Sequence, residues 1–271
     1  MEPIKNSKVK QQHKCQPPPM HKAWDDSLLL PKSDAGQIRF VHISDTHGFH
    51  RRLELPPGDV LIHSGDFSKR VGTLEEVTDF SRWLENLDYQ HKIIIAGNHE
   101  WSFDLGKENI LRKYPRCPSD PFSDIKKVIT GNDKFIYLEN SGTELYGYKI
   151  WGSPCQPVHL DQGFTLSEEK LCQVWSLIPD DTDILVTHGP PRGVLDEIGN
   201  GRGVGSTNLQ NEVFGRLSQK LKVHCFGHIH EAAGHETREG IEFFNSAICD
   251  KRYKPKQVCH WFDLPNLNSN R

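Results

Sequence analysis

The chain has 271 residues, a length that allows one large domain with a sizeable core or two small domains. Its 33 basic and 36 acidic residues give a formal net charge of −3, which argues against a protein devoted to extended nucleic acid. The seven cysteines form no Cys-x-x-Cys pair, and no stretch approaches the roughly 18 apolar residues of a membrane span. We therefore expect reduced thiols and a soluble, cytoplasmic protein without a membrane partner.

Residues 1–37 are rich in Lys, Gln and Pro and offer little to bury, so a mobile extension or a strap is predicted there. After this segment, short apolar runs alternate with a helical pattern. The segments are RFVHIS (39–44), DVLIHS (59–64), the helical TLEEVTDFSRWLENL (73–87) with capping-box spacing, and KIIIAG (92–97). This alternation predicts βαβ units and a largely parallel sheet.

The second half repeats the alternation and adds two hairpin patterns, ELYGYKIWG (144–152) and ETREGIEFFNSA (236–247). Its other segments are TDILVTH (182–188), the helical NLQNEVFGRLSQKL (208–221) and VHCFGH (223–228). Residues 113–124 are predicted to be irregular, and 192–208 to form a mobile glycine-rich loop. We predict an α/β domain over residues 38–264, with two mixed β-sheets packed face to face, helices outside and a short polar tail (265–271).

Polar residues follow five of the predicted strands, at the point where each strand ends. They are Asp45 and His47, Asp66, Asn98 and His99, His188, and His228 with His230. Strand ends in open α/β sheets meet in one crevice, so an active site is predicted there. Imidazole and carboxylate together suit Zn, Fe, Mn and Ni better than Ca. Two cations about 3.5 to 4 Å apart need a bridging anion, which Asp66 could supply.

Each motif alone has a simpler interpretation. An Asp-x-His or Gly-Asp after a strand is more often a turn, and the Gly-His-x-His pair could lie on a surface loop. All five together are hard to explain by accident. His42, His63 and His224 fall within strands and are expected in the core or supporting the site. The glycines of 192–208 lack the Lys-Ser/Thr of a phosphate loop, which favours a flexible lid.

The motifs DTH (45–47), GD (65–66), GNHE (97–100), TH (187–188) and GHIH (227–230) resemble the signature of the calcineurin-like metallophosphoesterases. The segments VTHGPPRGVLD (186–196) and HCFGHIHEAAGH (224–235) further resemble the metallophosphoesterase-domain-containing proteins, a group similar to class III cyclic nucleotide phosphodiesterases. The likeness covers about residues 38–263 and implies a four-layer sandwich with two divalent transition-metal ions. Mn is the ion it implies for an assay, with Fe, Zn, Co or Ni as alternatives.

The resemblance also implies a role for each motif residue. The first metal would be held by Asp45, His47 and His230, the second by Asn98, His188 and His228, with Asp66 bridging. Asn98 and His99 would contact the substrate, and His99 would stabilise developing charge or protonate the leaving oxygen. A hydroxide between the metals would attack phosphorus in line.

The leading hypothesis is a metal-dependent phosphodiesterase acting on small esters such as cyclic nucleotides. A protein Ser/Thr phosphatase is a weaker alternative, because GDFSKRVG lacks the Asp-Arg pair of that family and Trp101 stands where it has Arg. A nucleotide-binding sensor or scaffold with vestigial catalysis is the alternative from another class. The sequence leaves the oligomeric state open.

Overall fold

The computed structural model describes residues 21–22, 36–158, 160 and 162–268. Most of the predicted N-terminal extension therefore lies outside the described residues. Within it, β1 (His21–Lys22) pairs in parallel with β3 (Leu53–Glu54) on the body of the protein.

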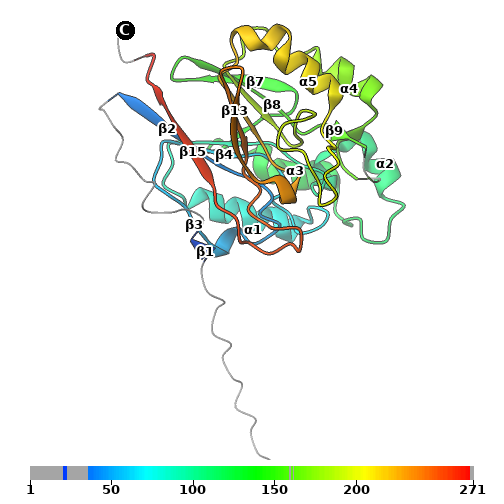
Figure 1. The fold of residues 1–271 in the computed structure, drawn as a ribbon. Coiled ribbons are helices and arrows are strands. Elements are labelled where there is room, and N and C mark those ends of the chain that lie inside the picture. The colour runs from blue at the N-terminus through cyan, green and yellow to red at the C-terminus, as the bar shows by residue number, and fades with distance from the viewer. Residues whose placement is uncertain (1–20, 23–35, 159, 161, 269–271) are drawn as a thin grey trace, which may run out of the picture.

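Two mixed sheets form the centre of the molecule (Figure 1). The five-stranded sheet has the order β15 (His260–Pro265), β2 (Gln37–Ile43), β4 (Val60–His63), β5 (His91–Ile94), β6 (Ile136–Tyr137). The six-stranded sheet has the order β13 (Gly234–Arg238), β14 (Ile241–Asn245), β12 (Val223–Phe226), β11 (Ile184–Thr187), β8 (Tyr148–Ser153), β7 (Ser141–Leu145). The inner strands run parallel, and β15, β13 and β7 are antiparallel to their neighbours. Both predicted hairpins are therefore confirmed.

The sheets pack face to face, and helices cover their outer faces. Phe40, Ile93 and Ile95 belong to the cluster between the sheets, which also contains Ile150 and Val186 of the second sheet. The outer face of the five-stranded sheet packs against α1 (Leu74–Glu85) and α3 (Phe122–Thr130). The other outer face packs against α4 (Glu168–Trp175) and α5 (Thr207–Phe214). The predicted sandwich is confirmed, and α1 and α5 lie on its opposite sides (Figure 1).

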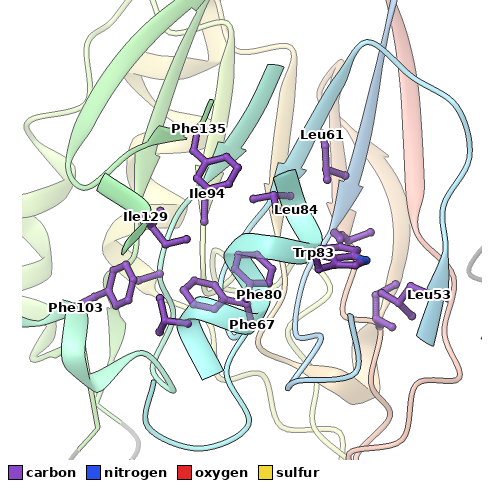
Figure 2. Packing of buried hydrophobic residues seen from close by; sticks show 14 of the residues in the cluster. Leu53, Leu61, Phe67, Phe80, Trp83, Leu84, Ile94, Phe103, Ile129 and Phe135 are labelled. Carbon is purple, nitrogen blue, oxygen red and sulfur yellow. The ribbon is translucent and has the colours of Figure 1, made fainter. Parts of the chain in front are cut away.

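The three successive isoleucines of KIIIAG serve both faces of the five-stranded sheet. Successive side chains of a strand point to opposite faces, so Ile93 and Ile95 face the second sheet while Ile94 faces the helices. Figure 2 shows Ile94 among the aromatic side chains beneath α1, including Phe67 and Phe80, whose rings stack 4.3 Å apart. The strand is therefore buried on both faces.

The helix boundaries agree only in part with the predictions. Thr73 begins α1 with the expected capping box, its hydroxyl accepting from the Glu76 N–H at 3.2 Å. The predicted helix over 208–221 is wrong in its second half: α5 ends at Phe214, because Gly215 leaves helical geometry, and a 3-10 turn (Arg216–Gln219) follows. Helices α3 and α4 were not predicted, and α3 begins inside the segment expected to be irregular.

Shorter elements complete the described chain. They are the helix α2 (Glu108–Leu111), the parallel pair β9 (Gln156–Pro157) and β10 (Thr165–Leu166), and the 3-10 turns His50–Arg52, Trp101–Phe103, Leu105–Lys107 and His230–Ala232. Each described helix is too short or too polar to cross a lipid bilayer. The six described cysteines are free thiols, as expected.

Candidate metal centre

The eight predicted site residues follow β2, β4, β5, β11 and β12, and the structure brings all of them together at the carboxyl ends of these strands. Three groups of residues each have their ligand-type atoms within 4.8 Å of one another. They are Asp45, His47 and His230; His47, Asp66 and His99; and Asp66, His188 and His228. The eighth residue, Asn98, joins the last group through Oδ1, which lies 2.9 Å from His188 Nε2. The five strand ends therefore form one site.

The backbone of these loops takes unusual conformations to aim the side chains inward. Left-handed φ angles of 53°, 42°, 55° and 68° occur at Asp45, His47, Asp66 and His228. Such angles cost energy in non-glycine residues and cluster at functional sites. Gly97 and Gly227 give the loops room, because a Cβ at Gly97 would overlap Asp66 Oδ1 and one at Gly227 would overlap Asp45 Oδ2.

The first group gathers three hydrogen-bond acceptors. Nδ1 of His47 lies 3.3 Å from the Ser68 carbonyl, and Nδ1 of His230 lies 3.0 Å from the Asp250 carbonyl. A carbonyl only accepts, so each Nδ1 carries a proton and each Nε2 is the nitrogen left to take a metal ion or a second proton. These two Nε2 atoms nevertheless lie 3.2 Å apart, and His230 Nε2 lies 3.2 Å from Asp45 Oδ1. Facing lone pairs need a proton or a metal ion between them.

The second group is built in the same way. His188 Nδ1 donates to the Ser64 carbonyl at 2.8 Å, so its Nε2 faces Asn98 Oδ1 and Asp66 Oδ1, the latter at 3.4 Å. The Asn98 amide nitrogen donates to Gln162 Oε1 at 2.8 Å, which leaves Asn98 Oδ1 as an acceptor. The His228 ring lies 5.0 Å from the His188 ring, centroid to centroid. Asp66 has one oxygen toward each group, with Oδ2 lying 3.8 Å from His47 Nε2.

The two buried carboxylates carry the electrostatics of the site. Asp45 and Asp66 are almost fully buried, and within the described chain no Arg or Lys pairs with either. Burial alone would raise the pKa of Asp45, but its hydrogen bond with His230 and the neighbouring histidines hold that pKa below its ordinary value. Burial likewise opposes charge on His188, yet Asp66 outweighs it and raises the pKa of His188 to about 9. The site therefore attracts cations, and the residues present fit divalent metal ions.

His99 stands between the metal-ligand groups and solvent. Its side chain is 12% exposed, and its Nε2 lies 3.9 Å from Asp66 Oδ2. Its backbone N–H donates to Asp66 Oδ1 at 2.8 Å, while its Nδ1 lies 3.2 Å from the Lys69 carbonyl. The Nε2 is therefore the nitrogen that faces the cleft, and at this distance from Asp66 it could contact either a bound substrate or a metal ion.

Glu100 holds two of the site loops together, a role that the sequence did not predict. Its buried carboxylate accepts from the backbone N–H groups of Asp66, Ser68 and Gly97, each at 2.8 Å. Burial, together with the charge of Asp66, raises the pKa of Glu100 to about 8. The fourth residue of GNHE thus ties the loop after β4 to the loop after β5, and the motif itself was the signal for it.

The strand histidines behave as predicted. His42 bridges the hydroxyls of Ser64 and Ser246, at 2.9 and 2.7 Å from its two ring nitrogens. His63 Nε2 lies 3.0 Å from the Thr46 hydroxyl, and His224 Nε2 lies 2.8 Å from that of Thr187. Thr46 and Ser64 lie in site loops and Thr187 directly precedes His188, so the three buried histidines support the centre from behind. Trp101 is fully buried against Tyr114 and is a packing residue.

A cleft of about 640 Å³ opens beside the centre, and Asp66, Asn98, His99, His228 and His230 line its floor. The predicted lid contributes Arg192, Ile198, Arg202 and Val204 to its wall. This loop is tied down from within by the buried carboxylate of Asp196, which accepts from the Gly205 N–H at 2.9 Å. Tyr253, on a turn that no sequence motif marked, also lines the cleft.

The fold and the site together define a metallophosphoesterase. The Calcineurin-like phosphoesterase family matches residues 38–232, and the chain belongs to this family. It is 38% identical to the Homo sapiens metallophosphoesterase domain-containing protein 1 over 240 residues, covering 85% of this chain and 72% of that protein. It is also 37% identical to the Caenorhabditis elegans UPF0046 protein C25E10.12, covering 84% and 82%. A solved crystal structure, only 12% identical, shares the fold with a TM-score of 0.54 over 84% of this chain and 95% of that one.

Proposed function

We propose that the protein is a dinuclear metal-dependent phosphodiesterase that hydrolyses small phosphodiesters such as cyclic nucleotides. The observation that carries this proposal is the convergence of acceptor atoms, above all the 3.2 Å separation of the His47 and His230 Nε2 atoms beside a buried carboxylate. When bound, divalent ions would acidify water and neutralise phosphoryl charge. Asp66, facing both groups, is the residue suited to hold two ions at once.

Under this proposal, seven residues would hold the metal ions and His99 would face the leaving group. The first ion would be held by Asp45, His47 and His230, and the second by Asn98, His188 and His228, with the phosphate bound over both. The Nδ1 of His99 is engaged by the Lys69 carbonyl, so Nε2 is the nitrogen that can face a leaving oxygen.

The small-diester preference rests on the shape and the charge of the site. The cleft of about 640 Å³ suits a ligand of nucleotide size. The net charge of −3 offers no general attraction for a long polyanion. The residue after GNHE is the buried Trp101, which cannot supply the phosphate-binding Arg expected of protein phosphatases.

The proposal is tested with bis(p-nitrophenyl) phosphate and cyclic nucleotides after removal of metal by chelation and addition of Mn, Fe, Zn, Co or Ni. Turnover should vanish in chelator, return with a divalent ion, and exceed turnover of a phosphopeptide. Metal analysis should find two ions per chain. Negligible turnover combined with tight nucleoside monophosphate binding would instead identify a nucleotide sensor, and a preference for the phosphopeptide would identify a protein phosphatase.

A further inference from the structure

Tyr253 lies over the metal centre, although it belongs to none of the strand-end motifs. Its ring centroid is 4.7 Å from that of His47, 5.2 Å from that of His230 and 6.0 Å from that of His99. The side chain is nevertheless 47% exposed, and it lines the cleft. The phenol ring therefore meets the rings of His47 and His230 edge to face, and its exposed part is available to a ligand.

The backbone at Tyr253 is strained in order to present this ring. Its φ is 55°, a left-handed angle that is rare for a bulky residue. The turn is held from within by Asp250, whose Oδ1 accepts from the N–H groups of Arg252 and Lys254 and whose carbonyl accepts from Tyr253. That same carbonyl is the partner of His230 Nδ1, so the turn is coupled directly to the first metal-ligand group. Strain maintained this way is typical of functional positions.

The wall of the cleft also includes apolar side chains that are exposed to solvent. Val158 and Leu160 are 60% and 56% exposed, and Ile198 and Val204 of the glycine-rich loop line the same cleft. Apolar side chains left exposed beside a phosphate-binding floor suit the organic group of an ester, since its burial would remove apolar surface from water. The cleft thus combines a polar floor with an aromatic ring and apolar side chains.

We propose that Tyr253 is a specificity-determining residue, whose ring forms a platform for a planar, aromatic organic group attached to the phosphorus bound at the centre. This inference rests on the proposed function for its physiological meaning. The binding itself needs only that the centre holds a phosphoryl group. An aromatic platform contributes a preference for planar groups because stacked rings bind more tightly than an aliphatic group of similar attachment.

The test uses two ligands that cannot be hydrolysed, phenylphosphonate and methylphosphonate, titrated into the Mn-loaded full chain by calorimetry. The wild-type protein should bind the phenyl compound about tenfold more tightly, as expected for one aromatic stacking contact. Tyr253→Phe should keep this ratio, whereas Tyr253→Ala and Tyr253→Leu should reduce it to about twofold or less. A ratio unchanged in both of the latter variants overturns the proposal.

Tyr146 supplies a matched control. It is a tyrosine with the same φ of 55°, but it lies between β7 and β8, where its hydroxyl donates to Gln90 Oε1 at 2.6 Å. Tyr146→Ala should leave the phenyl-to-methyl ratio unchanged. Tyr253→Leu retains apolar bulk over His47 and His230, so it provides a measurement if the alanine variant binds metal poorly.

Thermal unfolding of the Mn-loaded protein distinguishes a packing role of Tyr253 from a ligand-binding role. Tyr253→Gly should unfold at a temperature no lower than that of Tyr253→Ala, because both lose the ring but only glycine adopts a left-handed φ without steric cost. A lower unfolding temperature than wild type with an unchanged ligand ratio would make Tyr253 a packing residue. Turnover of bis(p-nitrophenyl) phosphate is measured separately: if it is absent while the Tyr253-dependent ratio persists, the proposed function fails and this inference stands.

Discussion

Replacing Asp66 by Asn should separate assembly of the metal centre from chemistry. The side chain is 3% exposed, its Oδ1 lies 3.4 Å from His188 Nε2, and its Oδ2 lies 3.8 Å from His47 Nε2. The amide keeps an oxygen to accept from the His99 N–H, so the loop geometry is retained while one negative charge is lost. The change therefore tests the charge of Asp66 rather than its shape.

The 3.4 Å between Asp66 Oδ1 and His188 Nε2 sets the expected loss of affinity. A unit positive charge at the position of His188 Nε2 would lose about 5 kcal/mol of attraction to Asp66 at an effective dielectric constant of about 20. Since about 1.4 kcal/mol corresponds to tenfold in an equilibrium constant, Mn affinity should fall by about three orders of magnitude. The assay is equilibrium titration of chelator-treated protein with Mn, with metal per chain measured after desalting. Asp79→Asn removes the same charge from a half-exposed surface pair with Arg51 and should leave affinity unchanged.

His99→Ala is the companion variant, because it alters the cleft side of the centre. It should keep Mn affinity within a few-fold while slowing turnover of an ester with a poor leaving group by about 10²-fold or more. A smaller loss is expected for p-nitrophenolate, which needs no proton to leave. If Asp66→Asn retains Mn affinity within tenfold of wild type, the bridging assignment is wrong. If His99→Ala loses metal as severely as Asp66→Asn, His99 belongs to the coordination shell.

Three further outcomes follow from the geometry. The pKa of His188 is raised to about 9 and that of His230 is also raised, so protons compete with Mn for their nitrogens. Mn affinity should therefore rise as pH increases from 6 to 9, and calorimetry in two buffers should measure the protons released on binding. An affinity that does not change with pH would contradict this reasoning. Gly97→Ala would overlap Asp66 and lie 2.6 Å from His188 Cε1, so Mn binding should be lost, whereas Gly199→Ala, whose Cβ would meet nothing closer than 3.9 Å, should behave as wild type in the same titration. Glu100→Gln replaces one of the two oxygens that accept three backbone N–H groups by an NH2 group, which leaves at least one buried donor unpaired. It should lower the free energy of unfolding by roughly 1 to 3 kcal/mol in urea titrations, and an unchanged midpoint would argue against this role.

The sequence by itself determined most strands of the two sheets, although not β6 and β15, and the residues at which the site begins. Apolar runs such as IIIA specify a strand buried on both faces, because neither face carries a polar side chain that could be turned to solvent. The capping box at Thr73 is equally local and was predicted correctly. Local patterns did not predict α3 and α4, and they overextended the helix that Gly215 interrupts.

Tertiary structure decided how those residues meet. The protonated nitrogen of His188 is set by the Ser64 carbonyl, and that of His230 by the Asp250 carbonyl; each contact joins residues more than a hundred positions apart or across separate turns. Tyr253 reaches the centre from a turn without any motif, because Asp250 forces a left-handed backbone there. Periodicity reports only on neighbours along the chain, whereas convergence on one cleft depends on which strands adjoin and on which loops fold back over their ends.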